Sequence, residues 1–129
     1  MLQIDDRLRA RDLLPAIDAM WSASAAKIRA LARDWSAASG SPVVTVAGRY
    51  TGRGWTEWTQ GFQHGSAILQ FDATGDEEFL RLGRDETYRH MGRHVTHMGV
   101  HDLGFNIGST YSVVHIAAWL VCNPRSGSA

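Results

Sequence analysis

Apolar residues recur every three or four positions along the first part of the chain, which is the spacing of one face of an α-helix. The stripe lies within residues 12–38 and consists of Leu14, Ile17, Trp21, Ala25, Ile28, Leu31, Ala32 and Trp35. Asp12 stands where an N-cap is expected, and Pro15 falls in the first turn, where its missing N–H does little harm. The Gly-Ser-Pro sequence at residues 40–42 predicts the end of this helix.

The next segment changes from helical periodicity to a short β-branched run. Residues 43–46 predict an extended connection with at most one short strand, and the glycines that follow predict a flexible loop. A second helix is expected over residues 56–72, with Thr56 as its N-cap. The residues that share one face of this helix are Trp58, Phe62, Gly65 and Leu69.

Two further helices are expected in the second half of the chain. Residues 73–76 predict a turn, and Asp76 can cap a helix over residues 77–94. After a loop at residues 99–105, a fourth helix is expected over residues 107–121, apolar on most sides. The pattern therefore predicts an all-α fold made of helical hairpins.

Composition and charge narrow the class of protein. A chain of 129 residues with 44% hydrophobic and 20% charged residues is typical of one globular domain. Its 13 basic and 13 acidic residues give no net charge, which argues against a nucleic-acid partner bound through bulk charge. We assign residues 1–122 to the domain and residues 123–129 to a disordered tail. Because a helix that is apolar nearly all round needs neighbours on several sides, we expect the domain to be partial.

The N-terminus and the single cysteine bear on location. Cys122 is the only cysteine, so no internal disulfide can form. Residues 1–11 lack an apolar signal-peptide core, and no run of about 18 apolar residues is present. These features favour a cytoplasmic protein with no membrane partner, although a periplasmic location is compatible with them.

Three stretches together resemble a known enzyme family. They are Trp55-Thr56-Glu57-Trp58-Thr59-Gln60-Gly61-Phe62, the segment from Phe71 to Leu80 containing Thr74-Gly75-Asp76, and His101-Asp102-Leu103-Gly104-Phe105. In this order and spacing, over residues 10–120, they resemble glycoside hydrolase family 88 and its relatives, the unsaturated glucuronyl hydrolases. The resemblance implies an (α/α)6 barrel, of which this chain would supply the first part.

The resemblance also implies an activity. Members hydrate the C4–C5 double bond of the unsaturated uronic acid at the end of an oligosaccharide, and the resulting hemiketal collapses to break the glycosidic link. One family carboxylate falls on Asp102, whereas the second has no match in these residues. We therefore expect an oligosaccharide substrate, no cofactor and no metal, and a truncated chain that is inactive alone. The oligomeric state is left open.

The same resemblance suggests the residues that shape a sugar pocket. Trp55, Trp58 and Phe62 fall where the family has an aromatic wall, and His64 and His101 could donate hydrogen bonds to the sugar. Simpler roles remain open for all of them. A tryptophan more often fills a core than binds a sugar, and Asp102 could be only the N-cap of the next helix.

Two alternatives belong to other classes. The histidines form one cluster with Asp102, consisting of His90, His94, His97 and His101. Because His90 and His94 are four residues apart, they share a helix face and could bind zinc in a small helical protein. The H-E-x-x-H pattern is missing, however, and Gly92 and Gly99 weaken a rigid scaffold. The third possibility is a non-catalytic interaction module built from helical repeats.

Overall fold

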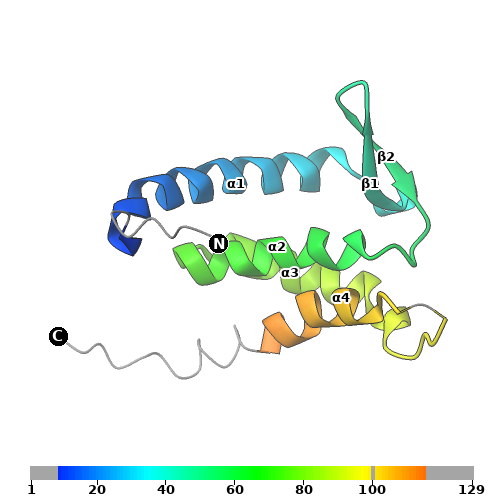
Figure 1. Ribbon diagram of the computed structural model, residues 1–129. Helices are drawn as coiled ribbons and strands as arrows, with labels where there is room; N and C mark the ends of the chain where they lie inside the picture. The colour runs from blue at the N-terminus through cyan, green and yellow to red at the C-terminus, as the bar shows by residue number, and fades with distance from the viewer. Residues whose placement is uncertain (1–8, 100, 116–129) are drawn as a thin grey trace, which may run out of the picture.

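The computed structural model describes residues 9–99 and 101–115 of the 129-residue chain, in which four α-helices and one two-stranded sheet are formed (Figure 1). The helices are α1 (Leu14–Asp34), α2 (Thr59–Thr74), α3 (Glu77–His90) and α4 (Leu103–Ile107), and the strands are β1 (Ser41–Val46) and β2 (Arg49–Arg53). The mainly helical character expected from the periodicity is confirmed. The sheet is an addition to the expected all-α class.

The helices run in alternating directions, and α2 packs against each of α1, α3 and α4. The backbone oxygen of Trp21, early in α1, accepts a hydrogen bond of 3.1 Å from Nε2 of Gln70, late in α2, so these two helices are antiparallel. Helix α3 returns along α2, because Gly83 lies against Ile68. Helices α1 and α3 thus share one direction and α2 and α4 share the other, as Figure 1 shows. The four described helices do not close into a ring, so the barrel stays a prediction.

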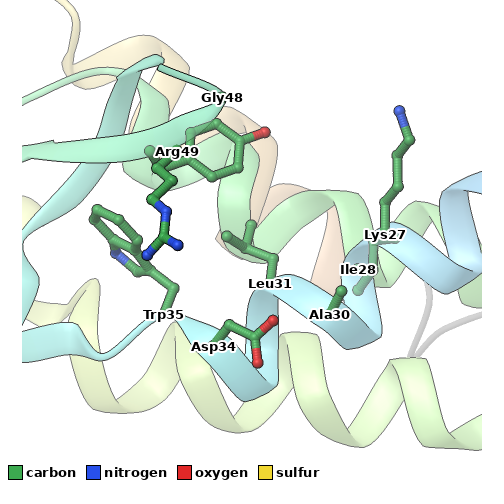
Figure 2. Close-up of a pocket in the computed structure, with 9 residues that line it drawn as sticks. Lys27, Ile28, Ala30, Leu31, Asp34, Trp35, Gly48 and Arg49 are labelled. Carbon is green, nitrogen blue, oxygen red and sulfur yellow. The ribbon is translucent and has the colours of Figure 1, made fainter. Parts of the chain in front are cut away.

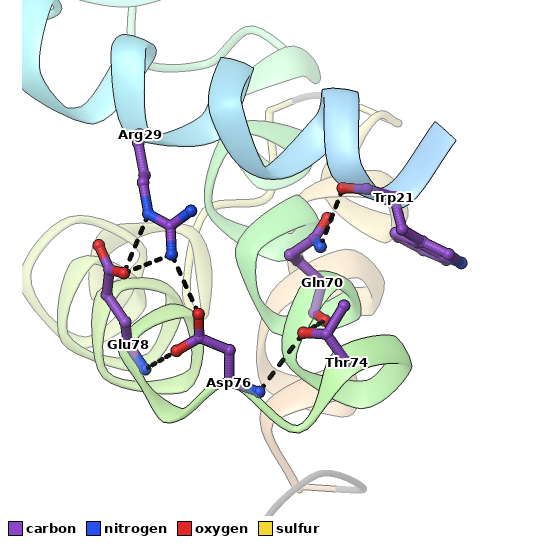
Figure 3. Close-up of polar contacts among 6 residues, drawn as sticks. All are labelled: Trp21, Arg29, Gln70, Thr74, Asp76 and Glu78. Carbon is purple, nitrogen blue, oxygen red and sulfur yellow. Dashed lines mark hydrogen bonds and ion pairs between the residues drawn. The ribbon is translucent and has the colours of Figure 1, made fainter. Parts of the chain in front are cut away.

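An arginine of α1 pairs with carboxylates at the start of α3 (Figure 3). Arg29 of α1 donates to Oε2 of Glu78 at 2.6 and 2.9 Å and to Oδ2 of Asp76 at 3.0 Å. Its guanidinium carbon also lies 4.5 Å from the centroid of the buried Phe79 ring. Because the charged groups are half exposed, their pairing orients α1 against α3 more than it stabilises the fold.

Helix α1 differs from its expected limits at both ends. Asp12 is not its N-cap, because a 3-10 turn (Ala10–Leu13) precedes the helix and the Asp12 carboxylate accepts from the backbone N–H of Arg9 at 2.9 Å. Pro15 lies in the first turn, as expected. The helix ends at Asp34, four residues early, where Trp35 becomes extended and donates from Nε1 to the Gly40 oxygen at 2.9 Å.

A β-hairpin follows where only one short strand was expected. Strands β1 and β2 pair in antiparallel register, and the turn between them places Ala47 and Gly48 at positive φ. The Tyr50 ring packs on the edge of Trp35 with centroids 6.1 Å apart. The sequence gives no signal for the second strand because every residue in it is exposed, so it has no apolar alternation.

The turn between α2 and α3 follows its prediction, whereas the start of α2 does not. Gly75 adopts the left-handed conformation at the end of α2, and Asp76 caps α3 by accepting from the Glu78 N–H at 3.0 Å. Helix α2 begins at Thr59 with Trp58 at the N-cap position, so Thr56 is not its cap. Its end at Thr74 lies close to the expected limit.

The predicted end of the third helix and the predicted start of the fourth were also wrong. Helix α3 ends at His90, and a 3-10 turn (Gly92–His94) follows because the His94 side chain turns into the interior. Helix α4 begins at Leu103, inside the expected loop, and continues through a π-turn (Gly108–Ser112). The rest of the fourth predicted helix after residue 115, the tail at residues 123–129 and Cys122 lie outside the described residues.

The interior of the described part is small and rich in polar side chains. Its buried apolar residues are Ala67, Ile68, Phe79, Met91 and Val114. Its buried polar residues are Ser41, Gln60, His64, Gln70, Thr87, His94, Asn106 and Thr110. No helix in the described ranges is long and apolar enough to cross a membrane.

Candidate functional site

The two aromatic motifs of the sequence meet where α2 and α4 begin. Glycines let the backbones approach closely: a Cβ atom on Gly61 would lie 2.6 Å from the Cα atom of Asn106, and one on Gly65 would overlap the Ser109 oxygen. The Gly61 N–H donates to Oδ1 of the buried Asn106 at 2.9 Å. Because Gly61 pairs with Asn106 and Gly65 with Ser109, α2 and α4 run parallel and begin at the same end.

An aromatic cluster forms there from Trp58, Phe62 and Phe105. The ring centroids lie 5.5 Å apart between Trp58 and Phe62, 6.1 Å between Trp58 and Phe105, and 6.0 Å between Phe62 and Phe105. The three side chains remain 44%, 44% and 53% exposed. Such packing of exposed rings leaves apolar faces open to a ligand. Trp58 and Phe62 were expected at the site, and the cluster brings them together.

Phe105 was not expected as a site residue, although the sequence contains a signal for it. Both motifs end in Gly-Phe, as Gly61-Phe62 and Gly104-Phe105. Once α2 and α4 are placed side by side and parallel, the repeated pair puts two phenylalanines at matching positions. The signal is the repetition and not the spacing within either motif.

Asp102 occupies the N-cap position of α4 without capping it. Its backbone oxygen accepts from the N–H groups of Phe105 and Asn106, but its carboxylate receives no capping hydrogen bond. Oδ1 lies 3.2 Å from Nε2 of His101, whose side chain is 94% exposed, whereas the Asp102 side chain is 27% exposed. The carboxylate is thus available for a ligand at the helix end, with His101 in solvent beside it.

Trp55 does not join the aromatic cluster. Its ring lies edge-on against two histidines, with centroids 5.2 Å from His94 and 4.9 Å from His97, and Arg93 lies 4.9 Å above it. His94 itself is fully buried, with Nε2 2.9 Å from Oε1 of Gln60. Because an amide oxygen only accepts, His94 donates from Nε2. Trp55 therefore holds the 3-10 turn against the start of α2.

His64 lies on another side of α2 and is not brought to the aromatic cluster. It stands two positions after Phe62, about 200° around the helix. Its ring faces α3 and stacks on His90 with centroids 5.8 Å apart. Only 6% of His64 is exposed, and burial lowers its pKa to about 4, although the charge of Glu86 acts in the opposite direction. His64 is therefore neutral at pH 7.

The histidines that suggested a metal site are separated by the fold. His90 pairs with Glu86 at 3.2 Å, His94 with Gln60, and His97 packs on Trp55. Among residues 9–99 and 101–115, no three His, Cys, Asp or Glu side chains are placed so that they could hold a metal ion. The end of α3 at His90 is the reason, because the later histidines no longer continue its face.

A hollow of about 770 Å³ lies away from both motifs, between α1 and the hairpin. Figure 2 shows Arg49 reaching into it beside Trp35, with Leu31 on the other side and Lys27 pointing away. Asp34 at its edge is held by Arg33 through hydrogen bonds of 2.7 and 2.9 Å. Opposite charges at an open surface give this hollow no clear preference for one ligand.

Comparisons with protein-family models, with curated proteins and with solved structures found no match to this chain. A function is therefore inferred from the arrangement of the residues described above.

Proposed function

We propose that this chain forms the first helical hairpins of an (α/α)-barrel glycoside hydrolase that acts on oligosaccharides ending in an unsaturated uronic acid. The observation that supports the proposal is the parallel pairing of α2 and α4, which brings Trp58 and Phe62 to Phe105. Phe62 and Phe105, 43 residues apart in the sequence, thus meet at one helix end. In such a barrel, α2 and α4 are inner helices, and α1 and α3 are outer ones.

The site chemistry suits a sugar with a flat, partly unsaturated ring. Exposed aromatic faces pack against the C–H face of a sugar, and the edges of Trp58 and Phe105 can orient it. Asp102 can accept a hydrogen bond from a sugar hydroxyl or from the water that adds at C5, and His101 can donate to the uronate. In the proposed reaction, an acid protonates C4, water adds at C5, and the hemiketal opens to release the next sugar.

The family reaction uses two carboxylates, and the residues present match one of them. Asp102 is the carboxylate that this chain contributes, and the second family carboxylate has no counterpart here. We therefore expect the chain to bind the sugar and not to turn it over. The cytoplasmic location expected from the sequence also stays a prediction.

Binding of an unsaturated glucuronyl disaccharide tests the proposal. In a two-dimensional NMR titration of the full chain, the Trp58 indole and the amides of residues 102–105 should shift and saturate. Trp58→Ala should weaken binding about two- to twelvefold, since an aromatic packing contact contributes about 0.5–1.5 kcal/mol. The ultraviolet absorbance of the double bond should stay constant.

Tyr88→Ala is the matched control, because Tyr88 is a 61% exposed aromatic residue of α3 that is not part of the aromatic cluster. It should bind the disaccharide as the wild type does. Equal affinities of wild type and Trp58→Ala, or saturable shifts that miss both motifs, would show that the aromatic cluster is not a sugar site.

A further inference from the structure

A buried asparagine joins the two Gly-Phe motifs beside the aromatic cluster. Asn106 has no exposed surface, and its Oδ1 atom accepts the 2.9 Å hydrogen bond from the Gly61 N–H. Gly61 immediately precedes Phe62 in α2, and Asn106 immediately follows Phe105 in α4. One hydrogen bond therefore ties the two backbones together one residue away from each ring.

The Gly61 N–H depends on this acceptor. It belongs to the first turn of α2, where backbone N–H groups have no carbonyl of their own helix to bond, and the side chain of Trp58 does not cap this helix end. Gly61 is also buried, and a Cβ atom on it would lie 2.6 Å from the Asn106 Cα atom. Because a buried N–H without an acceptor is unfavourable, the Asn106 side chain is what lets α2 begin this close to α4.

The contact between the two phenylalanine rings does not by itself fix their separation. Phe62 and Phe105 are 44% and 53% exposed, and their ring centroids are 6.0 Å apart. Rings that stay half exposed bury little apolar surface against each other, so their contact holds them only weakly. The buried contact of Gly61 with Asn106 sets the separation of the backbones that carry them.

Asn106 uses one of its two side-chain polar atoms in this contact. Oδ1 accepts from Gly61, whereas Nδ2 is buried and meets no hydrogen-bonding group of the described residues. The amide thus serves as an acceptor. An aspartate has the same shape and offers the same acceptor atom, so it is the conservative substitution that isolates this hydrogen bond.

We propose that Asn106 is a positioning residue of the sugar site, which sets the separation of the Phe62 and Phe105 rings through the Gly61 N–H and thereby the width of the aromatic face that the sugar meets. For the sugar, the inference rests on the proposed function, whereas the ring separation is a property of the free chain. Asn106 is buried and acts on the sugar only through the two phenylalanines.

NMR of the full chain without sugar tests the positioning role. In the wild type, the Phe62 and Phe105 ring protons should show nuclear Overhauser effects to each other, and the Gly61 amide should show a coupling across its hydrogen bond to the Asn106 side-chain carbonyl carbon. Asn106→Leu keeps the size but removes the acceptor, so it should abolish the coupling, weaken the ring contacts and shift the Gly61 amide proton upfield. Asn106→Asp should restore the ring contacts and the amide shift.

Titration with the unsaturated glucuronyl disaccharide connects the ring separation to binding. Asn106→Leu should bind it about fivefold more weakly than the wild type, within the range of one aromatic packing contact. If the wild type does not bind the disaccharide, the proposed function fails. The ring contacts of the free chain then still decide whether Asn106 positions the phenylalanines.

Thr110→Val is the matched control, because Thr110 is also fully buried and its Oγ1 donates to the backbone oxygen of Asn106. It removes one buried hydrogen bond from the same segment but leaves the Gly61 N–H bonded, so its ring contacts and its affinity should match the wild type. The proposal is wrong if Asn106→Leu keeps the wild-type ring contacts, if Asn106→Asp folds without restoring them, or if Thr110→Val disturbs them as much. Absence of the Gly61 coupling in the wild type would overturn it even where the leucine variant does not fold.

Discussion

Gly65→Ala is expected to destabilise the protein by about 3 kcal/mol and to lower its melting temperature by roughly 10 °C. The added methyl group would overlap the backbone oxygen of Ser109 and come within 3.3 Å of the Ser109 Cβ atom. A backbone atom cannot rotate away as a side chain can, so α2 and α4 would have to separate. The loss should appear in thermal unfolding followed by circular dichroism.

Gly108→Ala provides the matched control for this substitution. Gly108 has a helical φ of −63° and no atom within 4 Å of an added Cβ, so alanine should be neutral there or add up to about 1 kcal/mol of helix stability. If the two variants melt at the same temperature, the close packing of α2 on α4 is wrong. The proposed meeting of the two motifs would then lose its basis.

Acidification is expected to remove up to about 3 kcal/mol of stability through His64 alone. Its pKa falls from 6.5 to about 4 on folding, chiefly because burial disfavours the charged ring. The unfolded chain therefore binds more protons between these values. The stabilising effect is complete above pH 6.5 and is lost as the pH falls to about 4. Burial also lowers the pKa of His94, which adds an effect of the same sign.

Urea unfolding at a series of pH values would measure this effect in the wild type and in His64→Gln. Because glutamine does not titrate, the variant should lose less stability between pH 6.5 and pH 4, and the difference between the two curves isolates His64 from the carboxylates. His115→Gln should follow the wild type, since His115 is exposed. Parallel curves for the wild type and His64→Gln would mean that His64 is not buried as described.

The parts of the fold that the sequence predicted well are those with local causes. The apolar stripe of α1, the left-handed Gly75 and the Asp76 cap each depend on residues within one or two turns. The exposed strand β2 has no such signal, because its place is decided by pairing with β1 and by contact of Tyr50 with Trp35. The early end of α1 has the same origin, in the hydrogen bond from Trp35 to Gly40.

The site was predictable only as far as its residues share a motif. Trp58 and Phe62 lie on one face of α2, and the parallel α4 adds Phe105 to them. The positions of Trp55 and His64 could not be predicted in this way. Trp55 packs on the 3-10 turn that carries the buried His94, and His64 is buried between α2 and α3, where it stacks on His90. Both outcomes depend on tertiary packing of polar side chains, which periodicity does not encode.

Helix α1 has no fully buried residue, although Ile28, Leu31 and Ala32 line the hollow next to His64. Local opening costs least where few apolar contacts hold a segment, so α1, attached through the Gln70–Trp21 hydrogen bond and the half-exposed ion pairs of Arg29, is expected to open before α2, α3 and α4 separate. Such opening would expose His64 to water without any disruption of the aromatic end of α2.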